Sequence, residues 1–236
     1  MTDSEMPASS PPHRDGPNLG ILAVVALALT IAGLAISAAL SGGAILASPF
    51  GAATDVAHRY HEFWLATRVS AWLQFGSAVP LGIYAATAYA RLQRLGVRVP
   101  GPGIGFFGGT VAATMLMTSA LTGWVLSRPE VTGDAALTQA LSFFSFITGS
   151  AGFVVGMGLL IAGIAVPALI LRLTPRWLAV AGLVIAALAE LSFLAMIIEP
   201  LQFLFPIGRF LGLIWILLAG VLLPRRRVDV ARKVEA

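Results

Sequence analysis

Long apolar blocks dominate the chain and alternate with short polar segments, and each block runs for about 20 residues. As a helix with a rise of about 1.5 Å per residue, such a block spans the roughly 30 Å hydrocarbon core of a bilayer. The pattern therefore predicts an all-α fold, a polytopic membrane bundle of six transmembrane helices. The predicted spans are 19–40, 69–90, 104–126, 143–171, 177–198 and 203–223.

Polar segments flank these spans at both ends of the chain. Residues 1–18 combine Pro, Ser, Asp and Glu with few large apolar side chains, which predicts a disordered N-terminal tail. Residues 225–236 form a basic tail that begins with Arg225, Arg226 and Arg227, and we expect these three arginines to anchor the last helix to anionic lipid. The first block exceeds the usual apolar length of a signal peptide, so we expect it to be retained, although residues 37–39 also fit a cleavage site.

Basic residues fix the expected orientation. They are far more frequent on the side that holds both termini, the second-to-third connection and the fourth-to-fifth connection than on the opposite side. By the positive-inside rule, both termini are expected to be cytoplasmic. The net charge of +4 is therefore interpreted as a topology signal, and no nucleic-acid partner is expected.

The amino-acid composition limits the kinds of site and catalysis that the chain can contain. The chain is 58% hydrophobic and 11% charged, which favours lipid as its solvent. It contains no cysteine, which excludes disulfides, Cys-ligated zinc, iron–sulfur clusters and thiol catalysis. No nucleophile elbow, zinc-protease helix or phosphate-binding loop is present, so enzymatic activity is the minority interpretation.

Two ionisable residues lie inside the last two predicted spans, where lipid disfavours charge: Glu190 in the fifth and Arg209 in the sixth. Small residues recur on the same helix faces as these two side chains, and small residues mark helix contacts in membranes. We therefore predict that Glu190 and Arg209 face each other or a shared cavity within the bundle. An ion pair that only fixes helix packing also fits this pattern.

Further polar residues fall in the same, outer half of the predicted bundle. Arg68 and Gln74 join Glu190 and Arg209 in a predicted ligand or proton site. The remaining residues are hydroxyl side chains of the third and fourth spans, namely Thr118, Thr122, Ser142, Ser145 and Thr148. Together they predict a polar pocket that opens away from the cytoplasm.

Two other patterns favour structural roles. The third span carries threonines at strict four-residue spacing, at 110, 114, 118 and 122, which predicts helix packing with hydroxyls bonded to their own helix.

The connection 41–67 is expected to be an interfacial amphipathic segment. It holds His58, His61 and Glu62 at spacing that suits a metal or haem. Because no third histidine lies in the predicted core, we expect no cofactor.

From about residue 63 to 227 the chain resembles uncharacterised bacterial inner-membrane proteins that share a domain of unknown function. The resemblance rests on Gln74–Gly82 (QFGSAVPLG), on Val166–Leu169 with Pro175–Leu178, and on Arg209–Phe210 with Leu222–Pro224. It implies a bacterial plasma-membrane location and a compact helical bundle. It assigns no catalytic or binding residues.

The function expected from these observations is non-enzymatic. The leading hypothesis is a protein that binds, senses or transports a small molecule or lipid, with the bilayer itself as its surroundings. The alternative is a structural or regulatory subunit of a membrane complex, or a homo-oligomer, in which the same charges specify helix packing. A haem or metal oxidoreductase that uses the histidine pair is the least favoured hypothesis.

Overall fold

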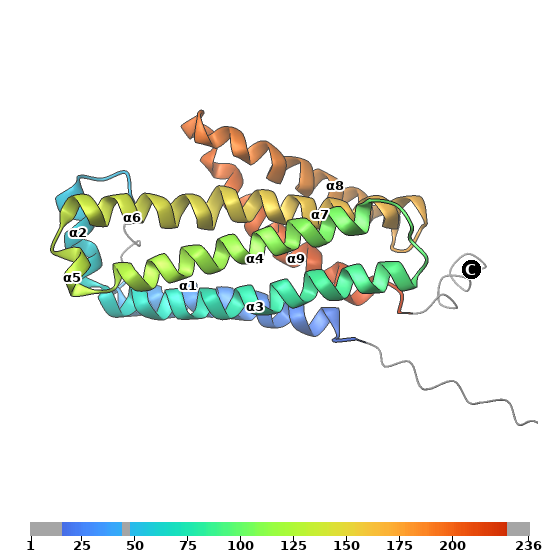
Figure 1. Cartoon of the computed structure of the whole chain (residues 1–236), viewed down its shortest axis with the longest axis horizontal. Coiled ribbons are helices and arrows are strands. Elements are labelled where there is room, and N and C mark those ends of the chain that lie inside the picture. The colour runs from blue at the N-terminus through green and yellow to red at the C-terminus, as the bar shows by residue number, and fades with distance from the viewer. Residues whose placement is uncertain (1–15, 44–47, 226–236) are drawn as a thin grey trace, which may run out of the picture.

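The protein is a bundle of long helices, seen in a computed structural model that describes residues 16–43 and 48–225 (Figure 1). No strand occurs in these residues. The helices are α1 (Leu19–Leu40), α2 (Ala53–Glu62), α3 (Trp64–Arg94), α4 (Gly101–Leu126), α5 (Pro129–Thr132), α6 (Ala135–Ile147), α7 (Phe153–Ile170), α8 (Arg176–Leu191) and α9 (Leu204–Leu222). A π-helical turn, η1 (Thr148–Gly152), joins α6 to α7, and two 3₁₀ turns, η2 (Ser192–Met196) and η3 (Glu199–Phe203), join α8 to α9.

Five of the described helical segments are long and apolar enough to cross a membrane, which indicates a membrane protein. They are Leu19–Leu40, Gly101–Leu126, Ala135–Ile170, Arg176–Met196 and Glu199–Leu222. The predicted second span, 69–90, lies within α3, which is long enough but is not among the five. Helix α3 packs against both α1 and α4 and buries its polar residues Ser77, Tyr84 and Thr87 there, so apolarity alone does not determine its place in the bundle.

The long helices form a closed ring. Along it α1 packs against α3, α3 against α4, α4 against α7, and α9 fills the space between α7 and α1. Helix α8 lies outside the ring against α7 and α9 (Figure 1). This arrangement leaves one interior, which side chains fill in one half and a cavity occupies in the other.

Glycines bring α4 and α7 into backbone contact. A Cβ added at Gly156 would lie 2.6 Å from the backbone nitrogen of Ala112, and one at Gly163 would lie 2.5 Å from the carbonyl oxygen of Gly101. Such distances leave no room for any side chain, so this pair of helices depends on glycine for its close approach.

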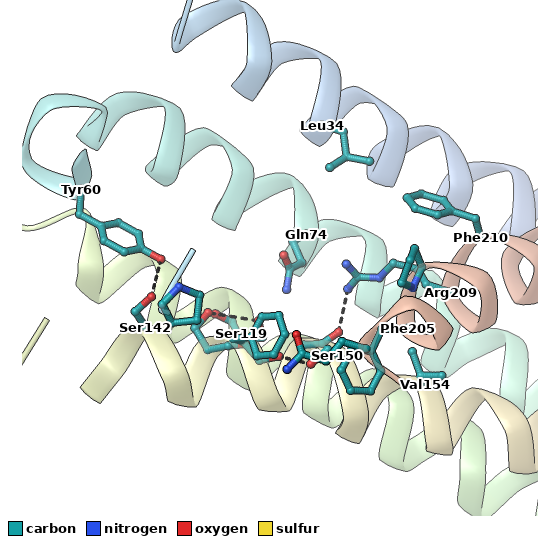
Figure 2. Close-up of a pocket in the computed structure, with 16 residues that line it drawn as sticks. Leu34, Tyr60, Gln74, Ser119, Ser142, Ser150, Val154, Phe205, Arg209 and Phe210 are labelled. Atoms are coloured by element: carbon teal, nitrogen blue, oxygen red, sulfur yellow. Dashed lines mark hydrogen bonds between the residues drawn. The ribbon is translucent and has the colours of Figure 1, made fainter. Parts of the chain in front are cut away.

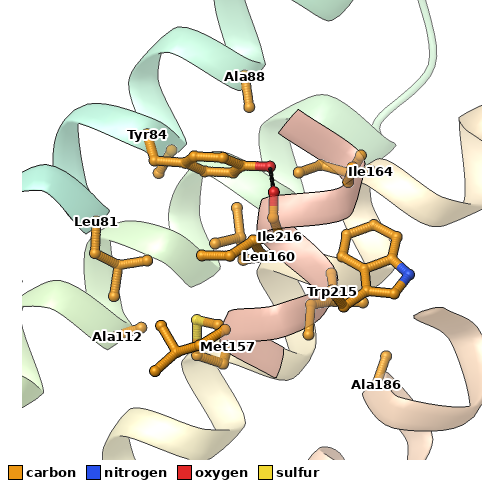
Figure 3. Close-up of a cluster of buried hydrophobic side chains, with 14 of the residues drawn as sticks. Leu81, Tyr84, Ala88, Ala112, Met157, Leu160, Ile164, Ala186, Trp215 and Ile216 are labelled. Atoms are coloured by element: carbon orange, nitrogen blue, oxygen red, sulfur yellow. Dashed lines mark hydrogen bonds between the residues drawn. The ribbon is translucent and has the colours of Figure 1, made fainter. Parts of the chain in front are cut away.

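A buried tyrosine lies in the filled, mostly apolar half of the interior. Tyr84 of α3 is buried, and its hydroxyl donates a 2.8 Å hydrogen bond to the carbonyl oxygen of Ile216 in α9 (Figure 3). Met157 and Leu160 of α7 pack beside it and are fully buried. Because a buried hydroxyl needs a partner, this bond satisfies Tyr84 and links opposite sides of the ring.

The two ends of the bundle differ in charge. We call the end formed by α2 and α5 the cap end; it holds every described acidic residue except Glu190 and Glu199, and Glu199 lies in the α8–α9 connection. The opposite end is the arginine end, defined by Arg94, Arg98, Arg172, Arg176 and Arg225. The start of α1 and the end of α9 both lie at the arginine end (Figure 1).

The expected segment boundaries agree with the structure at some positions and differ at others. Helix α3 extends beyond 69–90 at both ends, and the segment predicted as 143–171 begins at Ala135, where α6 starts. The predicted first span coincides with α1, and the connection 41–67 contains the short helix α2, which packs on α5 and α6. Most of the predicted tail 1–18, and the predicted anchors Arg226 and Arg227, lie outside the described residues. Arg225 is described and exposed.

Candidate functional site

A cavity of about 470 Å³ lies in the half of the bundle nearer the cap end. We call it the Arg209 cavity (Figure 2). Its walls come from most helices of the ring and from the cap, with Leu34 on α1, Gln74 on α3, Ser119 on α4 and Phe205 on α9. The other lining residues are Pro49, Tyr60, Ser142, Ser145, Phe146, Gly149, Ser150, Val154, Gln202, Pro206, Arg209 and Phe210.

The cavity exists because α9 begins at a level that other helices of the ring pass on their way to the cap end. Helix α9 starts at Leu204, whereas α1, α3 and the α6–α7 rod continue toward the cap end beyond that level (Figure 1). The space between α1 and α7 is therefore filled only in the half nearer the arginine end. Of the lining residues, Leu34 on α1 and Pro206 on α9 are exposed, and they mark the open side of the cavity.

Among the described residues that line the cavity, Arg209 is the only one with a charged side chain. Its guanidinium donates a 3.1 Å hydrogen bond from Nη2 to the carbonyl oxygen of Gly149, and its Cζ lies 4.9 Å from the centre of the Phe153 ring. A carbonyl and an aromatic face orient the group but do not neutralise it.

No carboxylate compensates this charge within the described residues. The two pairs of opposite charge found there are His58 with Glu62 and Arg128 with Glu130, and both are on exposed side chains. The Arg209 cavity therefore carries a net positive charge, and unpaired charge inside a bundle is costly unless water or an anion shares the site.

The π-helical turn η1 contains the carbonyl oxygen that accepts the hydrogen bond from Arg209. Such turns insert into α-helices mostly as single turns and often lie at functional sites. Gly149 lies within η1, and a Cβ added there would approach Ser119 Oγ to 2.5 Å. Glycine at this position lets η1 approach α4 while its carbonyl faces Arg209.

Hydroxyl groups line the wall toward the cap end and are themselves hydrogen-bonded. Ser119 Oγ donates to the carbonyl oxygen of Ser145 at 2.8 Å, and Ser145 Oγ donates to that of Ser119 at 3.1 Å. The Tyr60 hydroxyl and Ser142 Oγ lie 3.1 Å apart. Burial raises the pKa of Tyr60 above its ordinary value of 10.0, and the contact with Ser142 offsets part of that rise. Tyr60 is therefore a neutral phenol at physiological pH.

Two smaller cavities, of about 120 Å³ and about 40 Å³, share Gln74 with the Arg209 cavity. The smallest is also lined by Arg209 and extends to Ser77, whose hydroxyl donates to the carbonyl oxygen of Ala26. Beyond it, toward the arginine end, the packed core around Tyr84 begins (Figure 3). The polar space is thus closed on that side.

Glu190 does not join Arg209. Its Oε1 is buried without a hydrogen-bond partner among the described residues, and it lies where a Cβ added at Gly158 would be only 2.7 Å away. The expectation that the two side chains face each other or a shared cavity is therefore wrong, because Glu190 is not part of the Arg209 cavity lining.

The direction of side chains on antiparallel helices explains this separation. The backbones of Glu190 and Arg209 lie at about the same level of the bundle. Their preceding residues meet there, since a Cβ added at Gly208 would lie 3.5 Å from Ala189 Cβ. Each Cα–Cβ bond tilts toward the N-terminus of its own helix. On α9 this tilt directs Arg209 toward the cap end, and on α8 it directs Glu190 toward the arginine end.

Arg68 is also separate from the cavity. Its Nε donates to Ser127 Oγ at 3.1 Å, its Nη2 donates to the Ser127 carbonyl at 3.3 Å, and its guanidinium stacks over Trp64 at 4.8 Å. These contacts tie the start of α3 to the end of α4. Of the four predicted site residues, the structure brings together only Gln74 and Arg209.

The histidines of α2 have separate partners. His58 Nδ1 lies 3.7 Å from Glu62 Oε2 on an exposed surface, whereas His61 Nδ1 is 3.1 Å from Thr132 Oγ1 of α5. Among residues 16–43 and 48–225, no group of three or more His, Cys, Asp or Glu residues is arranged to hold a metal.

Three of the four threonines of α4 bond to their own helix, but Thr110 and Thr114 are exposed, so the predicted packing role is not seen at these two positions. The hydroxyls of Thr110, Thr118 and Thr122 each donate to the carbonyl four residues earlier. By contrast, Ser142 and Ser145 do line the cavity as part of the predicted polar half.

Sequence reasoning did not identify Tyr60, Gly149 or Phe205 as site residues, because their roles depend on the cap fold, the π turn and the level at which α9 begins.

Comparisons with protein-family models, with curated proteins and with solved structures found no match.

Proposed function

We propose that the chain is a six-span protein of the bacterial inner membrane, with both termini in the cytoplasm. The difference in charge between the two ends supports this orientation, because the arginine end would face the cytoplasm under the positive-inside rule. The start of α1 and the end of α9 lie at the same end of the bundle, which supports an even number of crossings, with α3 as the sixth.

Within this bundle, the Arg209 cavity binds an anionic amphiphile, a molecule with a carboxylate or phosphate head and an apolar chain. The observation that carries this proposal is a guanidinium in the cavity with no carboxylate partner among the described residues. Carboxylate and phosphate are the groups that arginine binds with two parallel hydrogen bonds. Apolar rings of Phe146, Phe205 and Phe210 line the same space and suit the chain of such a ligand.

Binding or sensing fits the cavity better than conduction. The open side at Leu34 and Pro206 lies between α1 and α9, so an amphiphile would arrive laterally from the lipid. The core around Tyr84 and Ile216 closes the other direction. This arrangement supports a site that is occupied from the membrane, not a pathway across it.

Native mass spectrometry after purification in mild detergent tests the proposal. The wild-type protein is expected to retain a bound anionic lipid or fatty acid, and Arg209→Gln is expected to lose it. Arg128→Gln is the matched control, because Arg128 is an arginine near the cap end that stacks on Trp124 and lines no cavity described here. Equal retention by wild type and Arg209→Gln, or retention of a partner protein and no ligand, would favour a structural subunit instead.

A further inference from the structure

Glu190 occupies a niche on α7 that is separate from the Arg209 cavity. A Cβ added at Gly158 would lie 2.7 Å from Glu190 Oε1, 3.0 Å from Ala189 Cβ and 3.2 Å from the carbonyl oxygen of Ala186. The absence of a side chain at Gly158 therefore creates the space that holds the carboxyl oxygen. Glu190 itself is partly buried, within a helical segment apolar enough to cross a membrane.

Nothing charged faces this carboxyl within the described residues. The elements packed on α8 are α7, α9 and η2. Helix α7 and η2 contain no titratable residue, and the single one of α9 is Arg209, which donates to Gly149 instead. Glu190 Oε1 is buried and accepts no hydrogen bond from any described group.

We propose that Glu190 is a proton-binding site inside the membrane, with its carboxyl held in the protonated form in the Gly158 niche. An ionised carboxylate without a cation or donors is strongly disfavoured in an apolar setting, and taking up a proton removes the charge. The ligand of this site is thus the proton itself. The inference stands apart from the proposed function of the Arg209 cavity, because the two sites share no residue.

The site is also a modification site for lipid-soluble carbodiimides, which react with protonated carboxyls. The carboxyl O–H adds across one C=N bond, with the proton going to nitrogen and the oxygen to the central carbon. The acyl group then migrates from that oxygen to nitrogen and leaves a stable N-acylurea. The step consumes no oxidant or reductant, and the protein gains the mass of one reagent molecule.

Infrared spectroscopy of the full-length protein in lipid vesicles tests the proposal at neutral pH. A C=O band of a protonated carboxyl is expected in the wild type and absent from Glu190→Gln. The other described acids, Asp55, Glu62, Glu130, Asp134 and Glu199, are all exposed, so the difference between wild type and Glu190→Gln assigns the band to the buried carboxyl. Lack of this band in the wild type would overturn the proposal, and so would its persistence in folded Glu190→Gln.

Labelling with dicyclohexylcarbodiimide gives a second result that needs no variant at Glu190. Peptide mass spectrometry is expected to locate the adduct on Glu190 and not on the exposed Glu199 of the same hairpin. Gly158→Ala places a methyl group against Oε1 and is expected to change the labelling rate at least twofold, whereas Gly103→Ala, where nothing lies within 4 Å of the added Cβ, is expected to leave it unchanged. Equal labelling of Glu190 and Glu199 would contradict a specific proton site.

Discussion

Arg209 donates from Nη2 to the backbone oxygen of Gly149 at 3.1 Å, and no carboxylate lies within ion-pair distance of it among the described residues. A carbonyl is a partial charge, so the guanidinium is oriented but remains cationic. This relationship supports the proposed binding role of the Arg209 cavity.

Access through the open side of the cavity predicts a selective effect of bulk on α1. Leu34→Trp fills the space between α1 and α9 and is expected to slow association of decyl phosphate several-fold. Ile31→Trp is the matched control, since Ile31 lies on the same helix, is 49% exposed compared with 45% for Leu34, and does not line the cavity. Stopped-flow association rates in phosphatidylcholine nanodiscs provide the measurement; equal rates for the two variants would rule out lateral access here.

The glycine contact between α4 and α7 predicts a loss of stability for a single added methyl group. Gly163→Ala directs Cβ at the backbone of Gly101 and Gly105, so the helices must separate, and we expect a cost of about 1–3 kcal/mol. Gly103→Ala meets nothing within 4 Å and is expected to be neutral or stabilising by up to about 1 kcal/mol. Thermal unfolding in detergent measures both. An unchanged midpoint for Gly163→Ala would mean that the helices are less closely packed than described.

The hydrogen bond across the ring predicts a smaller effect. Tyr84→Phe removes the donor to Ile216 and is expected to lower the free energy of unfolding by about 1 kcal/mol. Tyr89→Phe provides the comparison, because Tyr89 is 37% exposed and its ring packs on Phe106. If both variants unfold alike, the bond from Tyr84 makes no net contribution to stability.

Much of the architecture follows from the apolar blocks, because a backbone in lipid must satisfy its hydrogen bonds within helices. The ends of α1, and the hydrogen bonds from the hydroxyls of Thr110, Thr118 and Thr122 to their own helix, depend on local sequence in this way. The sequence also indicated that Gln74 and Arg209 belong to one polar region.

The remainder depends on tertiary geometry. Depth and helix face predict that Glu190 pairs with Arg209. Sequence position gives the depth of Cα only, and antiparallel helices direct their side chains to opposite ends. The π turn at Thr148–Gly152 has no sequence signature in the apolar pattern, and it determines which carbonyl meets Arg209. Depth alone predicts that Arg68 belongs to the site, whereas its hydrogen-bond partner Ser127 lies at the end of α4.

Alkaline pH should reveal the burial of Tyr60. Because burial raises the pKa of Tyr60 above 10.0, the unfolded chain loses this proton before the folded protein does. The contribution of Tyr60 to the free energy of unfolding is fully present below its pKa in the unfolded chain. It is lost as the pH rises through its pKa in the folded protein. We expect the unfolding midpoint of the wild type to fall more steeply above about pH 10 than that of Tyr60→Phe. Parallel curves for the two proteins would indicate that Tyr60 is exposed to water.

The most direct test of the Arg209 cavity is equilibrium binding of three ligands with the same chain and different heads. These are decyl phosphate, decanol and decyltrimethylammonium, measured in zwitterionic nanodiscs at neutral pH. Wild type and Arg128→Gln are expected to bind decyl phosphate at least about tenfold more tightly than decanol, a difference of about 1.4 kcal/mol, and Arg209→Gln is expected to lose that preference. Equal affinity of the wild type for decyl phosphate and decanol, or an undiminished preference in Arg209→Gln, would contradict an anion site at Arg209.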